Sequence, residues 1–203
     1  MRLVFLCLFL LAFGLKAEKP IVQAPQSIAI SELPTFTNNS VKVQQLLKLA
    51  LHLAGQNLGY YYGSADPSNG GMDCSGTIYY LLSRLGLKEL PRSSEGFYHW
   101  VKVKGHFYPV KDNDLFKSAQ LNKLIPGDLL FWSGTYQTKA YISHVMIYLG
   151  QNKQGEFLMI GASNGRTYQG KRRFGVSVFD FDMPAKQARA KFVGFSCIPE
   201  INC

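Results

Sequence analysis

Apolar residues recur at helical spacing in three stretches of the first half of the chain. The first stretch follows Ser40, a residue type that caps helices, and ends at Gly55. The second begins at or near Cys74 and ends at Gly86, and the third covers roughly residues 94–104. The spacing predicts one helix in each stretch.

The pattern changes after the turn at Pro126, where short apolar runs of strand length replace the helical stripes. These runs predict strands at residues 129–132, 144–149, 157–163, 175–181 and 192–198. Helices followed by strands are typical of the α+β class. We therefore expect N-terminal helices packed on a mainly antiparallel sheet of five to six strands.

The N-terminus has the pattern of an export signal. Arg2 precedes an apolar run from Leu3 to Leu15, and Ala17 is a small residue at the expected cleavage point. The run is short for a membrane span, so a signal peptide over residues 1–17 is favoured over an uncleaved anchor. We expect an exported protein, periplasmic or secreted, with no stable membrane span after cleavage.

The remaining chain is predicted to form one domain. Residues 18–39 carry three prolines and are expected to form an extended arm, which leaves residues 40–203 as the domain. Hydrophobic residues make up 47% of the chain and charged residues 17%, which excludes a disordered protein.

The chain is basic, with a net charge of +9 that falls to +7 when Arg2 and Lys16 leave with the signal peptide. A positive balance favours an anionic partner. The basic residues are scattered apart from residues 171–173, and no nucleic-acid-binding motif is present, so we expect no nucleic acid partner.

The cysteines separate into two groups. Cys7 belongs to the predicted signal peptide, and Cys197 and Cys203 are close enough in sequence to form a disulfide outside the cytosol. Cys74 is then left as an odd, reactive thiol. The histidines show no metal-ligand spacing, so we expect neither a metal nor another cofactor.

Cys74 is the candidate nucleophile. It lies in the sequence Asp73-Cys74-Ser75-Gly76, after a glycine-rich loop and at the start of a predicted helix. The positive potential of a helix N-terminus favours the thiolate, and the free N–H groups there could form half of an oxyanion hole. The polar neighbours argue against a cysteine that only fills the core.

His144 is the candidate general base, because it begins a predicted strand. If Leu149 pairs with Glu156 across the next turn, His144 lies opposite Gly161, which has no side chain to orient the imidazole. Three groups could take that role: Ser163, which is on the same face within diagonal reach, Asn164, or a backbone carbonyl.

Five segments in this order resemble the NlpC family of bacterial cell-wall cysteine peptidases, which have a permuted papain-like fold. They are Tyr60–Gly63, Asp73–Gly76, Pro91–Ser94, Pro126–Trp132 and His144–Gly150, and the resemblance covers roughly residues 41–181. It implies cleavage of peptidoglycan stem peptides, typically between D-glutamate and a diamino acid, through a Cys-His thiolate and an acyl-enzyme.

The resemblance also assigns roles to individual residues. Cys74 would be the nucleophile and His144 the base. The residues expected to line the acyl and substrate sites are Tyr60, Asp73, Ser75 and Arg92. Asp73 and Ser75 would contact amine and carboxylate groups of the stem peptide, and Arg92 would bind substrate carboxylates or support the structure.

The sequence departs from the family at Gly161, where the family usually carries histidine or another polar residue. Two alternatives to the peptidase therefore stay open. One is a wall-binding module with weak or lost catalysis, and the other is a papain-like amidase that acts on a different substrate.

Overall fold

The computed structural model describes residues 23–203. The predicted signal peptide (1–17) and the first part of the predicted arm lie outside the described residues. Within residues 23–203, no helix is long and apolar enough to cross a membrane.

The three predicted helices are present: α1 (Val41–Ala54), α2 (Cys74–Arg84) and α3 (Ser94–Lys104). Each begins with a side-chain cap of the kind that satisfies a free N–H group in the first turn. The capping oxygens of Ser40, Asp73 and Ser93 accept from the N–H three residues later, at 3.3, 2.6 and 3.0 Å.

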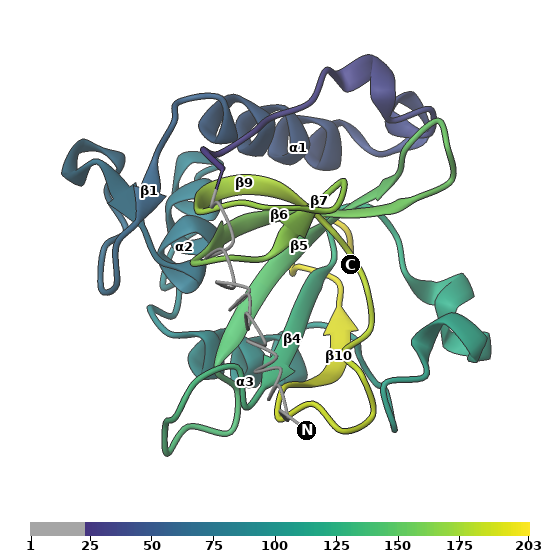
Figure 1. Cartoon of the computed structure of the whole chain (residues 1–203). Coiled ribbons are helices and arrows are strands. Elements are labelled where there is room, and N and C mark those ends of the chain that lie inside the picture. The colour runs from purple at the N-terminus through teal and green to yellow at the C-terminus, as the bar shows by residue number, and fades with distance from the viewer. Residues whose placement is uncertain (1–22) are drawn as a thin grey trace, which may run out of the picture.

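The five predicted strands and one further strand, β3, form one antiparallel sheet of six strands in the order β3-β10-β4-β5-β6-β9 (Figure 1). Their bounds are β3 Phe107–Pro109, β4 Leu129–Ser133, β5 His144–Gln151, β6 Phe157–Ser163, β9 Gly175–Asp180 and β10 Lys191–Ser196. This confirms the α+β class. Two separate two-stranded sheets are also present. One is the parallel pair β1 (Gly59–Tyr60) and β2 (Gly71–Met72), and the other is the antiparallel pair β7 (Thr167–Tyr168) and β8 (Lys171–Arg172).

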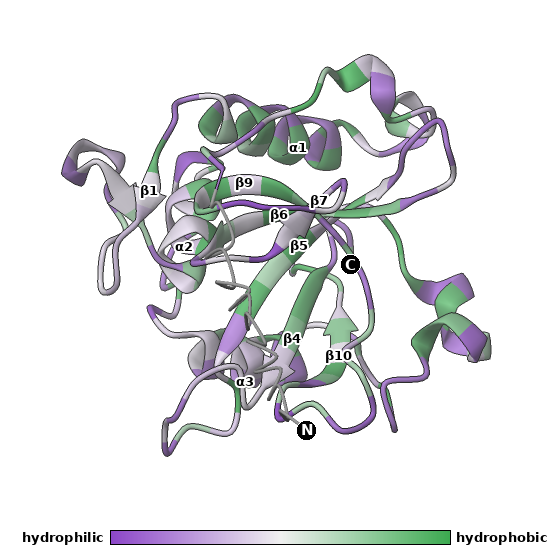
Figure 2. Ribbon diagram, viewed as in Figure 1, coloured by the Kyte–Doolittle hydropathy of each residue, from purple (hydrophilic) through white to green (hydrophobic). Residues whose placement is uncertain are grey.

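Each face of the sheet packs against a separate core. Alternate strand residues such as Val145 and Ile147 pack with the helices, and their neighbours such as Met146 and Tyr148 pack into a second, aromatic-rich core. Residues 110–124, which include the short helices η4 (Leu115–Lys117) and η5 (Ala119–Lys123), contribute to that second core. Because both faces are covered, the central strands β4 and β5 are mostly hydrophobic in Figure 2, apart from the hydrophilic lower end of β5.

The predicted register between β5 and β6 is wrong by two residues. A bulge between Tyr148 and Gly150 shifts the pairing, and the inner pairs are Ile147 with Ile160 and Tyr148 with Met159. The error comes from the turn: the Asn152 N–H donates to the Glu156 carbonyl, so the loop is only residues 153–155 and the pairing beside it is off by three residues. The bulge then takes one residue back, because it adds a residue to one strand only. Continued to the start of β5, the observed register places His144 opposite Ser163 rather than Gly161.

The arm residues 23–39 lie against the domain. The Gln26 N–H donates to Ser177 Oγ at 2.9 Å, and the Val178 N–H donates to the Gln26 carbonyl at 2.9 Å. Two short helices, η1 (Ile30–Glu32) and η2 (Phe36–Asn38), continue the segment toward α1. The arm therefore runs along the outer edge of β9.

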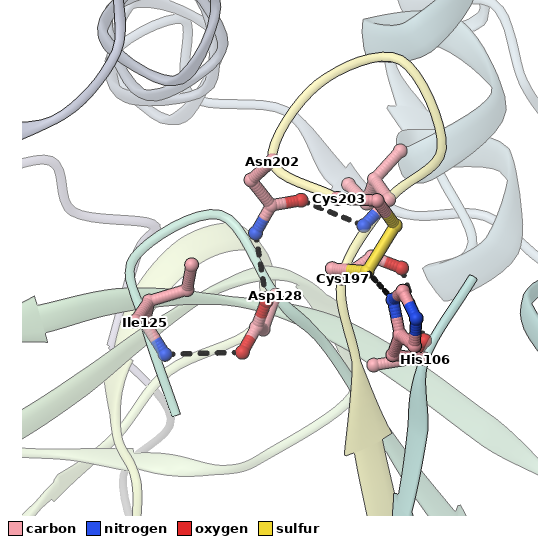
Figure 3. The surroundings of a disulfide bond; sticks show 8 residues. His106, Ile125, Asp128, Cys197, Asn202 and Cys203 are labelled. Atoms are coloured by element: carbon pink, nitrogen blue, oxygen red, sulfur yellow. Dashed lines mark hydrogen bonds between the residues drawn. A yellow bond between two sulfur atoms is a disulfide. The ribbon is translucent and has the colours of Figure 1, made fainter. Parts of the chain in front are cut away.

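The C-terminal tail is fixed by a disulfide and a buried aspartate (Figure 3). Cys197 and Cys203 are bonded, and His106 lies beside them with Nδ1 3.7 Å from the Cys197 sulfur. Asn202 donates from Nδ2 to Asp128 at 2.7 Å. The three side chains at the disulfide are close enough to ligate a metal ion, but both sulfurs are already used in the bond.

Asp128 makes the stability of the tail region depend on pH. Burial raises the pKa of Asp128 to about 7, although the Ile125 N–H and Asn202 oppose the rise by donating to the carboxylate. An unfolded aspartate ionises near pH 4, so the folded state holds an extra proton between about pH 4 and pH 7. The free energy of unfolding contributed by Asp128 therefore falls through this range as pH rises, by at most ~4 kcal/mol, and is level above it.

We expect the difference in unfolding free energy between the wild type and Asp128→Asn to shrink by a few kcal/mol (~2–4) from pH 4 to pH 8. Urea unfolding at each pH measures it. Asp112→Asn, at an exposed aspartate, is the control and should show no such trend. A difference in unfolding free energy between wild type and Asp128→Asn that stays constant with pH would contradict the raised pKa of Asp128.

Candidate functional site

Cys74 is the first residue of α2 and a buried, free thiol. The chain can bring the loop of residues 63–65 tightly against this turn because Gly76 has no side chain, and a Cβ there would collide with the Ser64 carbonyl. The Asp73 N–H also donates to that carbonyl at 3.1 Å. The nucleophile candidate is therefore held by a close backbone contact on its helical turn.

Asp73 is the centre of a hydrogen-bond network below the thiol. One carboxylate oxygen accepts from the Gly76 N–H at 2.6 Å and from the Ser75 hydroxyl at 3.1 Å. The other accepts from the Gly63 N–H at 2.7 Å, and Arg92 binds both oxygens at 3.1 Å. Such a bidentate ion pair fixes geometry as well as charge. Asp73 and Arg92 thus chiefly position Cys74 and Ser75.

The thiol is neutral in the resting site. Burial, together with the nearby Asp73 carboxylate, raises the pKa of Cys74 to about 11. The backbone N–H groups of Val145, Ser75 and Cys74 lie at the sulfur and oppose this rise. The N–H groups of helix residues Cys74 and Ser75 precede the first intrahelical bond, so they are available to an oxyanion.

His144 begins β5, directly before the Val145 N–H that lies at the thiol. Burial, and then the charge of Arg166, hold the pKa of His144 well below its usual value, so the imidazole is neutral at pH 7. Within residues 23–203, Nε2 of His144 has no hydrogen-bond partner. A neutral imidazole with a free nitrogen can accept a proton from the thiol.

Ser163 and Gly161 differ in what they offer to His144. Ser163 is buried and lines the same cavity as His144, consistent with the observed register. Gly161 instead lies under Met146, whose Cε would be 3.2 Å from a Cβ at that position. A side chain at position 161 would therefore meet Met146, and Ser163 is the polar residue that the register places across from the imidazole.

Two cavities meet at the site. The smaller, of about 230 Å³, is lined by Cys74 together with Asp73, Ser75 and Arg92. The larger, of about 530 Å³, is lined by His144 and Ser163. Three tyrosines line both cavities: Tyr60, Tyr62 and Tyr136. The tyrosines mark one continuous cleft with the thiol in one half and the imidazole in the other.

Tyr60 lies next to the thiol. Burial, and then the charges of Cys74 and Asp73, raise the pKa of Tyr60, so its hydroxyl stays protonated and can donate a hydrogen bond. Its place follows from the β1–β2 pair, which sets Tyr60 opposite Met72, two residues before Cys74.

The structure brings together all seven residues predicted for the site, and it adds others that the sequence did not single out. The added ones are Tyr62, Trp132, Tyr136 and Arg166. Trp132 was predicted only as part of a buried strand, and Tyr136 and Arg166 lie in loops without a repeating pattern. The one signal in the sequence for Arg166 is its position, three residues after the candidate Ser163.

A thiol at a helix N-terminus beside a neutral imidazole on a neighbouring strand is the arrangement of cysteine-type hydrolases. Residues 57–171 match the family model described as the NlpC/P60 family, and this match spans more than half of the chain. The chain belongs to the NlpC/P60 family.

Three curated relatives of the chain are named as endopeptidases. The chain is 29% identical over 122 residues to the probable endopeptidase YafL and 29% identical over 117 residues to the murein DD-endopeptidase MepH, both of Escherichia coli K12. It is 30% identical over 110 residues to the bifunctional muramidase/DL-endopeptidase CwlT of Bacillus subtilis 168. The aligned parts cover 59%, 57% and 54% of this chain but only 41%, 37% and 27% of those proteins.

A solved structure supports the fold. A protein of Staphylococcus aureus Mu50 described as similar to lipoprotein, NLP/P60 family, superposes with a TM-score of 0.54 at 20% identity. The match covers 87% of this chain and 44% of that one. The sheet and helix arrangement is therefore shared with an NLP/P60 protein.

The state of the thiol can be measured by alkylation. We expect the rate of iodoacetamide reaction at Cys74 to rise about tenfold per pH unit from pH 7 to pH 10, because the thiolate fraction grows toward a pKa of about 11. Intact-mass analysis without reductant counts the adduct, and Cys74→Ala is the blank. A rate that levels off below pH 7 would show a preformed thiolate instead.

Proposed function

We propose that the chain is an exported endopeptidase that cleaves the stem peptides of peptidoglycan, with Cys74 as nucleophile and His144 as base. Three lines support this proposal: the family of the chain, relatives named as a murein DD-endopeptidase and a muramidase/DL-endopeptidase, and a cleft with a helix-capped thiol beside a neutral imidazole. The last is the observation that carries it.

The reaction would proceed through an acyl-enzyme. His144 takes the proton of the Cys74 thiol as the sulfur attacks the peptide carbonyl, and the new oxyanion accepts from the N–H groups of Cys74 and Ser75 and from the Tyr60 hydroxyl. The intermediate collapses to a thioester while the imidazolium gives its proton to the leaving amine. A water molecule, deprotonated by His144, then hydrolyses the thioester and restores the thiol.

The smaller cavity suits the acyl half of the substrate, because it contains the thiol. Ser75 lies there beside Arg92, whose side chain is 39% exposed and so retains contact with the cleft. The bond we expect to be cut is that between D-glutamate and the diamino acid, which places the glutamyl carbonyl at Cys74. The diamino acid then provides the leaving amine.

The positive charge of the chain fits this substrate and location. Peptidoglycan and its associated polymers are anionic, so a basic protein is drawn to them from solution. Export by the signal peptide at residues 1–17 would bring the enzyme to that polymer, in a bacterial periplasm or outside the cell.

We expect Cys74→Ala to abolish release of stem-peptide fragments from purified peptidoglycan, and His144→Ala to reduce it at least about a thousandfold. Mass spectrometry of the soluble fragments gives both the rate and the bond that is cut. His52→Ala changes an exposed histidine on α1 and serves as the control with full activity.

If the wild type releases no fragments from peptidoglycan, sedimentation with peptidoglycan tests the alternative of a wall-binding module. A wild-type protein that releases nothing under mild reducing conditions is not an endopeptidase. If both it and Cys74→Ala still sediment with peptidoglycan, the fold serves as a wall-binding module.

Ser163 is proposed to position His144, so Ser163→Ala should lower kcat about tenfold with little change in KM. Ser163→Thr keeps a hydroxyl and should recover most of the loss. The pH profile of kcat/KM should also shift on its acidic limb in Ser163→Ala, because the environment of the imidazole has changed. An unchanged profile, or no rescue by threonine, would reduce Ser163 to a packing role.

A further inference from the structure

Arg166 is a cation in the cleft that has no anionic partner among residues 23–203. Its guanidinium carbon lies 4.2 Å from the centre of the Trp132 ring, and the side chain is partly buried. Within residues 23–203 its side chain makes no hydrogen bond and no ion pair, whereas the Arg92 side chain is bound to Asp73 on both oxygens. Burial lowers the pKa of Arg166 only to about 10, so it is charged at neutral pH.

The larger cavity contains further polar groups that lack a partner. Nε2 of His144 and Nε1 of Trp132 have no hydrogen-bond partner among the described residues, and both side chains line the cavity with Arg166. Asp182, an exposed acid, lines it as well and forms no ion pair with Arg166. One cation and one anion thus face the same space without neutralising each other.

The chemistry of the proposed reaction places the leaving half of the substrate here. The group that protonates the leaving amine must lie on the leaving side of the attacked carbonyl, and that group is His144. The thiol lines the smaller cavity and the imidazole the larger one. The residue after the scissile bond therefore enters the cavity of Arg166.

We propose that Arg166 is a specificity-determining residue, which binds a carboxylate on the side chain of the residue after the scissile bond. Its planar guanidinium presents paired donors that match a carboxylate, and Trp132 holds it in place from one face. Asp182 supplies the acceptor for an ammonium on the same side chain. The cavity thus selects a diamino acid that ends in both groups over one that ends in an amine alone.

The inference rests on the proposed function, and binding measurements test it without requiring turnover. The probes are two synthetic peptides, L-Ala-γ-D-Glu-X-D-Ala, in which X is meso-diaminopimelate or L-lysine. The two differ only in the side-chain carboxylate. Calorimetric titration into Cys74→Ala protein gives the affinity for each probe without hydrolysis.

We expect Cys74→Ala to bind the diaminopimelate peptide at least about tenfold more tightly than the lysine peptide, because a charged hydrogen-bonded contact is lost with the carboxylate. Adding Arg166→Met should remove this preference by weakening the diaminopimelate peptide alone. Adding Asp182→Asn should weaken both peptides, because both carry the amine. Lys139→Met removes an exposed cation outside the cavity and is the control for general charge.

Three results would overturn the inference: equal binding of the two peptides, no binding of either, or an equal loss for both in Arg166→Met. Failure of the proposed function has a different signature. In that case the diaminopimelate preference and its loss in Arg166→Met persist, while the wild type releases no fragments from peptidoglycan.

Discussion

The site depends on the bidentate ion pair between Asp73 and Arg92. A carboxylate that caps a helix normally makes one or two bonds to the first turn, but Asp73 also ties down the Gly63 N–H and the Ser75 hydroxyl. Asp73 thereby joins the segment Tyr60–Gly63, the start of α2 and, through Arg92, the segment before α3. The carboxylate also disfavours a thiolate at Cys74, and Arg92 offsets part of that charge. Asp73 thus fixes the position of Cys74, but its charge makes the thiolate harder to form.

The proposed nucleophile and the proposed base come from the two layers of the fold. Cys74 belongs to the helical layer and His144 to the sheet, and they meet because the thiol packs at the Val145 N–H. Both are neutral at rest, so proton transfer would accompany attack rather than precede it. Arg166 strengthens this arrangement, because its charge disfavours an imidazolium at His144. A bound carboxylate on Arg166 would reduce that penalty just when the imidazolium has to form.

The sequence predicts much of the fold and the central residues of the site. Helices α1, α2 and α3 follow from apolar spacing and from caps such as Ser40 and Asp73, which act within a few residues. The lining of the cleft does not follow from such local signals, because Tyr136 and Arg166 reach it from loops whose course depends on tertiary packing. The predicted register of β5 on β6 is also wrong, because the strands pair as far as Gln151 and Phe157 and turn residues alone do not show where the pairing ends. Local signals therefore indicate the candidate nucleophile, and long-range packing determines its surroundings.

The arm that runs along β9 has a consequence for solubility. β9 is the last strand of the main sheet, so its outer N–H and C=O groups would be open to pairing with another chain. Gln26 occupies part of that edge, and the Leu58 carbonyl accepts from the Val176 N–H at 2.9 Å. The opposite edge is the short strand β3, which ends in Pro109. Both edges of the sheet are thus protected against strand addition, which disfavours edge-to-edge aggregation of the protein.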